Sequence, residues 1–154
     1  VMEKVRQAIV MDMHYWKKTE PEPVSERTPR FRDIRVSHVS VADADEAGYF
    51  HGLEEMPIEG VTLDDVRIRA RKPFWCRHAN DLDLRHVRVE AAEAPALSFE
   101  NVEGLALDRV EAVAPGGAGP GIRLWNVRRA LLRQCETEGG VDTSACDPSS
   151  VRIV

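Results

Sequence analysis

Five segments of this 154-residue chain repeat one spacing of apolar residues. Each reads apolar, x, apolar, x, x, apolar, x, and then a small or apolar residue. The segments begin at Ile34, Val61, Leu82, Leu105 and Ala130, so the starts are 27, 21, 23 and 25 residues apart. This period lies in the range of solenoid repeats and varies too much for an array of helical hairpins. The repeat therefore predicts similar turns of chain stacked on one another.

In the segments that begin at Ile34, Val61 and Leu82, the first two apolar residues alternate with polar ones, as Leu82 and Leu84 do. This two-residue period is typical of a half-buried strand. The next two polar residues predict a corner, after which the chain points inward again at Val39, Val66, Val87, Val110 and Cys135. A second short apolar run precedes most segments, at 47–50, 73–76, 96–99 and 121–125. Each turn is therefore expected to contain several strands.

These patterns predict an all-β fold, a right-handed single-stranded parallel β-helix of about five to six turns. Residues 7–13 add an earlier partial turn, and residues 1–154 form one domain that is expected to be a fragment of a longer β-helix. Residues 138–154 are expected to form an irregular tail. A β-sandwich also has short strands about 8 to 12 residues apart and stays an alternative. Nine prolines and ten glycines interrupt the chain too often for a four-helix bundle.

Asn101 and Asn126 occupy equivalent places in successive turns, four residues before their segments. Asparagine tolerates a positive φ better than most residues, and equivalent amides can stack along the axis of a solenoid. These two residues are therefore predicted to form tight corners with a structural role.

Composition excludes several classes of function. The net charge is −5 with both signs interspersed, which argues against a nucleic-acid partner. No apolar run approaches the roughly 18 residues of a membrane span. The histidines, acidic residues and glycine-rich stretch at 115–121 show neither metal-ligand spacing nor a phosphate loop. The sequence therefore predicts no metal, no cofactor and no membrane partner.

The chain has three cysteines, an odd number that cannot form a complete disulfide framework. A bridge between Cys135 and Cys146 is one possibility. The alternative is that Cys76 and Cys135 fill apolar interior positions, as free cysteines often do.

The stretches "QAIVMDMHYW", "TPRFRDIRVSHVSV" and "AGYFHGLEEMPIEGVTLDDVRIRA" together resemble glycoside hydrolase family 28, the polygalacturonases and rhamnogalacturonases. An aromatic-ended strand, a loop and two consecutive β-helix turns follow the catalytic region of that family in this order. The last turn is matched by Gly52, Leu53, Glu55, Pro57, Ile58, Val61, Leu63 and Val66. The resemblance covers about residues 7–70 and becomes a general solenoid pattern beyond them.

The resemblance implies an inverting hydrolase of galacturonate-containing pectin, secreted or periplasmic, that uses aspartates from Asn-Thr-Asp and Asp-Asp motifs. None of the family's catalytic motifs is in its proper place here. Asp64 and Asp65 form an Asp-Asp pair at a repeat corner, and His51 with Gly52 precedes a scaffold turn. In the order of the family, this chain would begin just after an Arg-Ile-Lys motif. No catalytic residue is therefore assigned.

One substrate-binding position of the family falls inside the chain. The resemblance places Tyr15 at the edge of the substrate cleft, where an aromatic ring with a hydroxyl can stack on a sugar and donate a hydrogen bond. His14 and Trp16 are its neighbours, with the alternative that they only cover the end of the strand.

The leading hypothesis is the C-terminal β-helix part of a polygalacturonase-like hydrolase whose partner is a galacturonate-containing polysaccharide, inactive alone. The alternative is a free-standing β-helix that binds carbohydrate or protein without catalysis, and a fragment with no evolved function stays open. Residues 1–13 show no cap over the terminal core. Self-association through that end is therefore expected.

Overall fold

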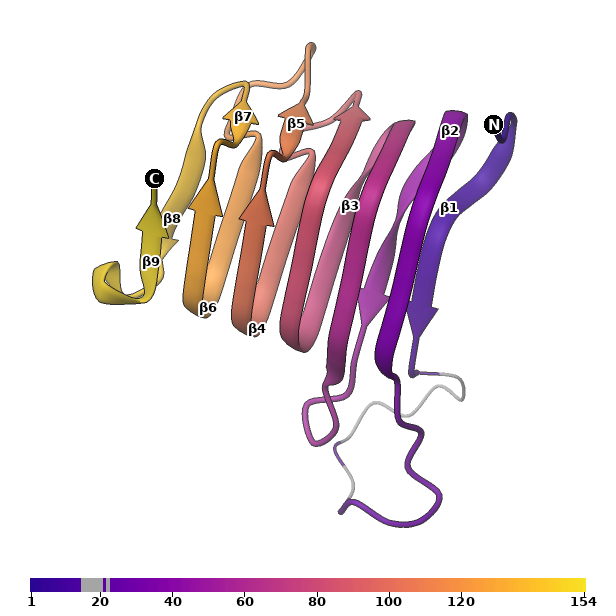
Figure 1. Cartoon of the computed structure of the whole chain (residues 1–154), viewed down its shortest axis with the longest axis vertical. Helices are drawn as coiled ribbons and strands as arrows, with labels where there is room; N and C mark the ends of the chain where they lie inside the picture. The colour runs from indigo at the N-terminus through magenta and orange to yellow at the C-terminus, as the bar shows by residue number, and fades with distance from the viewer. Residues whose placement is uncertain (15–20, 22) are drawn as a thin grey trace.

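The computed structural model describes residues 1–14, 21 and 23–154. In this part of the chain the strands wind into an all-β solenoid of about five turns, stacked side by side from the indigo N-terminal end to the yellow C-terminal end (Figure 1). The elements are β1 (Val5–Asp12), β2 (Arg32–His51), β3 (Ile58–Ala91), β4 (Leu97–Asp108), β5 (Glu111–Val113), β6 (Ile122–Arg133), β7 (Glu136–Thr137), β8 (Val141–Ala145), the 3-10 helix η1 (Pro148–Ser150) and β9 (Val151–Ile153).

The strands of the described residues join into one nine-stranded sheet with the order β1-β2-β3-β4-β6-β8 along its main path. Each of these neighbours pairs in parallel, as Ile34 does with Val61 and Leu82 with Leu105. The repeat segments found in the sequence therefore lie in register, one turn above the next. This confirms the predicted parallel β-solenoid and excludes a β-sandwich, whose sheets are antiparallel.

Long strands can wrap around the axis because single residues with positive φ bend them. At about 3.3 Å per residue, a straight strand of the 34 residues of β3 would be over 100 Å long. The predicted corners all bend in this way, at His38, Asp65, His86, Arg109 and Gln134, with φ between 49° and 57°. A second column of corners has positive φ at Asp33, Gly60, Asp81, Gly104 and Arg129.

The core is a stack of apolar side chains from equivalent positions of each turn. Leu82, Leu84, Leu105 and Leu107 are each 1% exposed. Phe50, Cys76, Phe99 and Leu124 form a second inward column and follow one another in register. No polar or charged residue is buried in the described part of the chain. Burial of apolar surface therefore stabilises the turns, as the alternation in the sequence predicts.

Asn101 and Asn126 form the expected corner, with φ of 54° and 48°. The side-chain amide of Asn126 donates to the carbonyl oxygen of Asn101 at 2.7 Å, along the axis of the solenoid. The prediction of stacked amides is confirmed. His78 occupies the same corner one turn earlier, with φ of 56°.

The expectation of an irregular tail at 138–154 is wrong. β8 and β9 both pair in parallel with β6, so these residues continue the stack. The sequence hides this because short strands here alternate with turn residues, and Asp147 accepts a hydrogen bond from the backbone of Ser149 to start η1. Tertiary pairing, rather than local apolar content, makes the segment regular.

Cys76, Cys135 and Cys146 all lie in the described part of the chain and are free thiols. The predicted interior position of Cys76 is confirmed, since it is 1% exposed. Cys135 and Cys146 are half-buried and lie near backbone carbonyl oxygens, those of Leu107 and Leu124. The possible Cys135 to Cys146 bridge is not formed.

At the N-terminal end, β1 pairs only with the later part of β2. Ile34, Val36 and Val39 in the earlier part are only partly buried, although Val61, Leu63 and Val66, their equivalents in the next turn, are buried. The self-association expected from this end stays a prediction. None of the described residues forms a helix long and apolar enough to cross a membrane.

Gly48 is a position where the stack has no room for a side chain. It pairs with Ile9 and has φ of +122°, and a Cβ there would lie 1.8 Å from the Ile9 carbonyl oxygen. We expect Gly48→Ala to lower the free energy of unfolding by about 3 kcal/mol or more, because β1 must move away. Gly140→Ala, where φ is +79° and nothing lies within 4 Å, is the control and should cost only about 1 kcal/mol. Equal losses in urea denaturation would contradict the proposed backbone clash.

The Asn101 corner can be divided into its two contributions. Asn101→Gly keeps the positive φ and loses the amide contact, at an expected cost of about 1 kcal/mol. Asn101→Ala loses the contact and also strains the corner, adding a further 1–2 kcal/mol or so. Urea denaturation of both variants measures the difference. If alanine is tolerated as well as glycine, the corner does not depend on the left-handed conformation.

Candidate functional site

The candidate site is one outward surface of the stacked strands. Residues next to the inward column that contains Phe50 and Cys76 point outward, because side chains alternate along a strand. These outward residues lie in register from turn to turn: Asp12 pairs with His51, His51 with Arg77, Arg77 with Glu100, and Glu100 with Trp125. We call this surface the aromatic face; it comprises Asp12, His14, Tyr49, His51, Trp75, Arg77, Glu100 and Trp125.

Aromatic rings gather on this face. Tyr49 and Trp75 are neighbours in register, and their rings stack with centroids 4.7 Å apart and planes 4° from parallel. The guanidinium of Arg77 lies 5.5 Å from the centroid of the Trp75 ring and forms an ion pair with Glu100 at 2.9 Å. Trp125, further along the same face, is 57% exposed. A solvated tryptophan of this kind is available for contact with a ligand.

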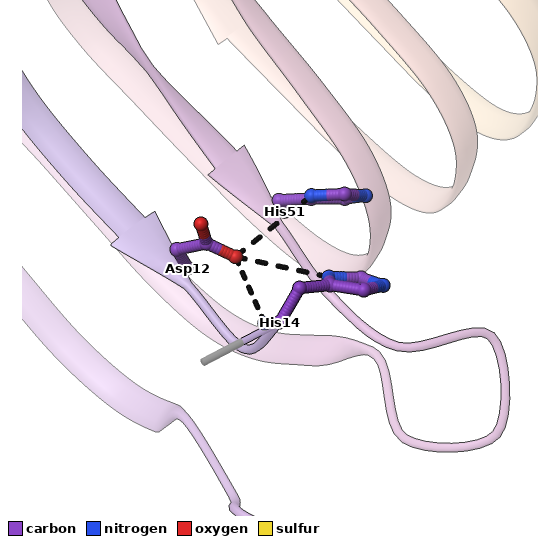
Figure 2. Close-up of side chains that lie close together, drawn as sticks. All are labelled: Asp12, His14 and His51. Carbon is purple, nitrogen blue, oxygen red and sulfur yellow. Dashed lines mark hydrogen bonds and ion pairs between the residues drawn. The ribbon is translucent and has the colours of Figure 1, made fainter. Parts of the chain in front are cut away.

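Asp12, His14 and His51 form a cluster at one end of the aromatic face (Figure 2). Asp12 is the last residue of β1, and His51, the last residue of β2, is its partner in register. Both histidines direct Nδ1 at the same Asp12 oxygen, Oδ1, at 3.7 Å for His14 and 3.8 Å for His51. Their rings stack on each other with centroids 3.7 Å apart.

Hydrogen bonds fix the Asp12 carboxylate from both sides. Oδ1 accepts from the backbone N–H of His14 at 2.8 Å, and Oδ2 accepts from the Tyr49 hydroxyl at 3.2 Å. Burial, followed by the charge of Asp12, raises the pKa of Tyr49, so this hydroxyl keeps its proton and stays a donor. The carboxylate therefore joins the histidine pair to the aromatic pair.

The His14 ring is incompletely satisfied. His14 Nδ1 is inaccessible to solvent and has no hydrogen-bond partner in the described part of the chain. Its distance to Asp12 is longer than a hydrogen bond. Burial lowers the pKa of His51, and a positive charge on the adjacent His14 ring would lower it further. The imidazole of His51 is therefore kept largely neutral near pH 7.

The three side chains also bring metal-ligating atoms together. One ligand atom from each of Asp12, His14 and His51 lies within 4.8 Å of the other two. Neither spacing nor motif signalled this in the sequence, because Asp12 and His51 are 39 residues apart. Only the register of β1 with β2 brings them side by side. The sequence interpretation of His51 as a scaffold residue missed this surface role.

The other predicted site residues are distributed as follows. Tyr15, the one predicted substrate contact, and Trp16 lie outside the described residues. Asp64 and Asp65 lie at a corner, as the sequence indicated: Asp65 has φ of 53° and Asp64 contacts Arg35 and His86. Those hydrogen bonds, from His86 first and then Arg35, lower the pKa of Asp64. The Asp-Asp pair is therefore an ionic corner away from the aromatic face.

A groove of about 820 Å³ lies on another side of the solenoid, lined mainly by the outward residues of 65–69 and 86–90. Its arginines are largely occupied by partners within the chain. Arg88 pairs with Glu111, and Arg109 bonds to His86 and Gln134. The Arg69 Nε donates to the Ala42 carbonyl. These cations stabilise the wall of the solenoid, so the groove is a weaker candidate than the aromatic face.

The fold places the chain in the class of parallel β-solenoids. Comparisons with protein-family models, with curated proteins and with solved structures each found no match.

Because burial lowers the pKa of His51, stability should depend on pH through this residue. Below the ordinary histidine pKa of about 6.5, the unfolded chain binds a proton at His51 that the folded chain resists, so the folded state loses stability as pH falls. We expect His51→Gln to reduce the loss of unfolding free energy between about pH 7.5 and 5.5, measured by urea denaturation in a chelating buffer. His38→Asn, at an exposed corner, is the control and should leave the slope unchanged. If unfolding free energy depends on pH in His51→Gln as it does in the wild type, His51 is not the source of this pH dependence.

Proposed function

We propose that this chain is the C-terminal β-helix part of a polygalacturonase-like glycoside hydrolase and that its aromatic face binds galacturonate-containing polysaccharide. The observation that carries the proposal is the presence of three aromatic residues on one outward surface: Tyr49 and Trp75 in one column and Trp125 in the adjacent column. Amphipathic aromatic rings make apolar contacts with sugar C–H groups while polar neighbours bind hydroxyls. The resemblance over residues 7–70 supplies the choice of substrate.

The charges beside the aromatic rings fit an acidic sugar. Arg77 lies next to Trp75, and its partner Glu100 is a half-exposed carboxylate that a substrate carboxylate can replace. A guanidinium pairs with a carboxylate through two parallel hydrogen bonds. Since Arg77 and Glu100 side chains are 46% and 39% exposed, the pair is accessible from solvent.

The aromatic face continues from the strand that the resemblance places at the edge of the cleft. Asp12 lies three residues before Tyr15 on the stretch "MDMHYW". His51 and Arg77 follow Asp12 turn by turn along the axis, at the spacing of paired strands, about 4.8 Å. A polysaccharide lying along the axis would therefore meet one outward residue of this column per turn.

No catalytic step is assigned to the chain, because the aspartate motifs that the resemblance requires are absent from its sequence. A binding module without catalysis would use the same face, and the aromatic residues favour carbohydrate as its ligand as well. Neither function predicts that the purified chain releases reducing ends from polygalacturonate. Substantial release would contradict the assignment of a binding role alone.

Binding tests the aromatic contribution. We expect Trp75→Ala and Trp125→Ala each to weaken binding of oligogalacturonate about tenfold, the equivalent of a little over 1 kcal/mol of lost ring contact. Isothermal titration calorimetry with a chelator present measures the affinity without metal ions. Ile153→Ala removes an equally exposed apolar side chain, 59% exposed on β9, and should have no effect. Unchanged affinity in both tryptophan variants would exclude the aromatic face.

The charge contribution is tested by selectivity. Arg77→Gln should reduce the preference for oligogalacturonate over a neutral oligosaccharide of equal length, because the guanidinium recognises the carboxylate. Arg35→Gln makes the same change in net charge at the Asp64 corner and should keep the preference. A wild-type chain that binds both saccharides equally would contradict galacturonate as the ligand.

A further inference from the structure

The Asp12, His14 and His51 cluster goes beyond what saccharide binding requires. Its donor atoms are two imidazole nitrogens and one carboxylate oxygen, and both nitrogens point at the same oxygen. At 3.7 and 3.8 Å these contacts are too long for hydrogen bonds. The cluster therefore groups three atoms that can ligate a metal and that form no hydrogen bonds with one another.

The spacing of these donors is close to that of ligands around a transition metal. Donors about 2.0–2.1 Å from a tetrahedral Zn²⁺ ion lie roughly 3.4 Å from one another. The oxygen-to-nitrogen distances of 3.7 and 3.8 Å exceed this value by a few tenths of an ångström. Imidazole nitrogen selects zinc and its neighbours in the first transition row over Mg²⁺ and Ca²⁺, which prefer oxygen ligands.

A second layer of contacts supports the donors. The Tyr49 hydroxyl donates to Asp12 Oδ2 and leaves Oδ1 directed at the histidines. Tyr49 is in turn held by its stack on Trp75. Contacts of this kind orient metal ligands and reduce the reorganisation that binding requires. His14 Nδ1 is inaccessible to solvent and has no hydrogen-bond partner in the described part of the chain. A bound ion would supply the partner that this nitrogen lacks.

We propose that Asp12, His14 and His51 form a binding site for a divalent first-row transition ion of the zinc type, with His14 and His51 ligating through Nδ1 and Asp12 through Oδ1. The stacked rings must open on binding, because the lone pairs of parallel imidazoles do not meet at one point. The histidine side chains are 28% and 25% exposed, so solvent borders the rings that turn. Three protein ligands leave a further position for water or an anion.

Metal titration of the untagged full chain tests the site. After treatment with a chelator, the chain is titrated calorimetrically with zinc chloride, and Co²⁺ absorption in the visible range reports the coordination. One ion per chain is expected. Asp12→Asn and His51→Gln should each weaken zinc binding about tenfold or more, since each removes one of three ligands. His38→Asn and His86→Gln, which remove histidines at corners away from the cluster, should bind zinc as the wild type does.

Zinc binding that is equally tight in Asp12→Asn, His51→Gln and the wild type would overturn the proposal, as would the absence of saturable binding by the wild type. Histidine ring ¹H–¹⁵N spectra of the wild type provide a test that depends on no variant. Zinc should shift the Nδ1 signals of His14 and His51 and leave that of His38 in place. Shifts confined to other histidines would also overturn the proposal.

The metal site and the saccharide site can fail separately. Zinc binding is measured without saccharide, and saccharide binding is measured in chelator. The failure of either measurement therefore leaves the other conclusion in place.

Discussion

The whole molecule depends on single residues that adopt a left-handed backbone conformation. Each such residue changes the direction of a strand in one step, so the chain can return to the same place after about 21 to 27 residues. The conformation is unfavourable for most residues by about 1–2 kcal/mol. The core of stacked leucine, valine and phenylalanine side chains offsets this cost, because each corner brings further apolar residues into contact with those of the preceding turn. Corners and core are therefore two parts of one arrangement, and neither is stable without the other.

This arrangement also explains how a functional surface arises. Outward side chains do not pack in the core, so packing does not restrict their chemistry. The parallel register places each of them next to its equivalents in the adjacent turns. Asp12 and His51 come together in this way, as do Tyr49 and Trp75. A loop such as 52–57 changes the length of a turn without changing this alignment. The surface is thus built by the pairing of backbones, and its chemistry is decided by a few side chains that no packing constraint selects.

The sequence predicted the parts that follow from local pattern. The inward alternation, the corner at Asp65 and the paired amides of Asn101 and Asn126 repeat at a recognisable phase, so one chain is enough to find them. The strands in 138–154 escaped prediction because they are short and owe their regularity to pairing with β6. The Asp12, His14 and His51 cluster escaped for a different reason. Histidine and aspartate on an outward face have no periodic signal, and their meeting depends on the pairing register of β1 with β2, two strands separated by a long connection.

The register of the stack has a consequence for how such a chain can change over generations. An inserted residue in a loop such as 115–121 leaves every turn aligned, and the loop absorbs it. An inserted residue inside a strand such as Leu97–Asp108 moves each following side chain to the opposite side until the next corner, exchanging buried for exposed positions. Length variation is therefore confined to the loops, while the strands vary by substitution alone. Outward positions can then acquire new chemistry one residue at a time, with their neighbours in adjacent turns already about 4.8 Å away.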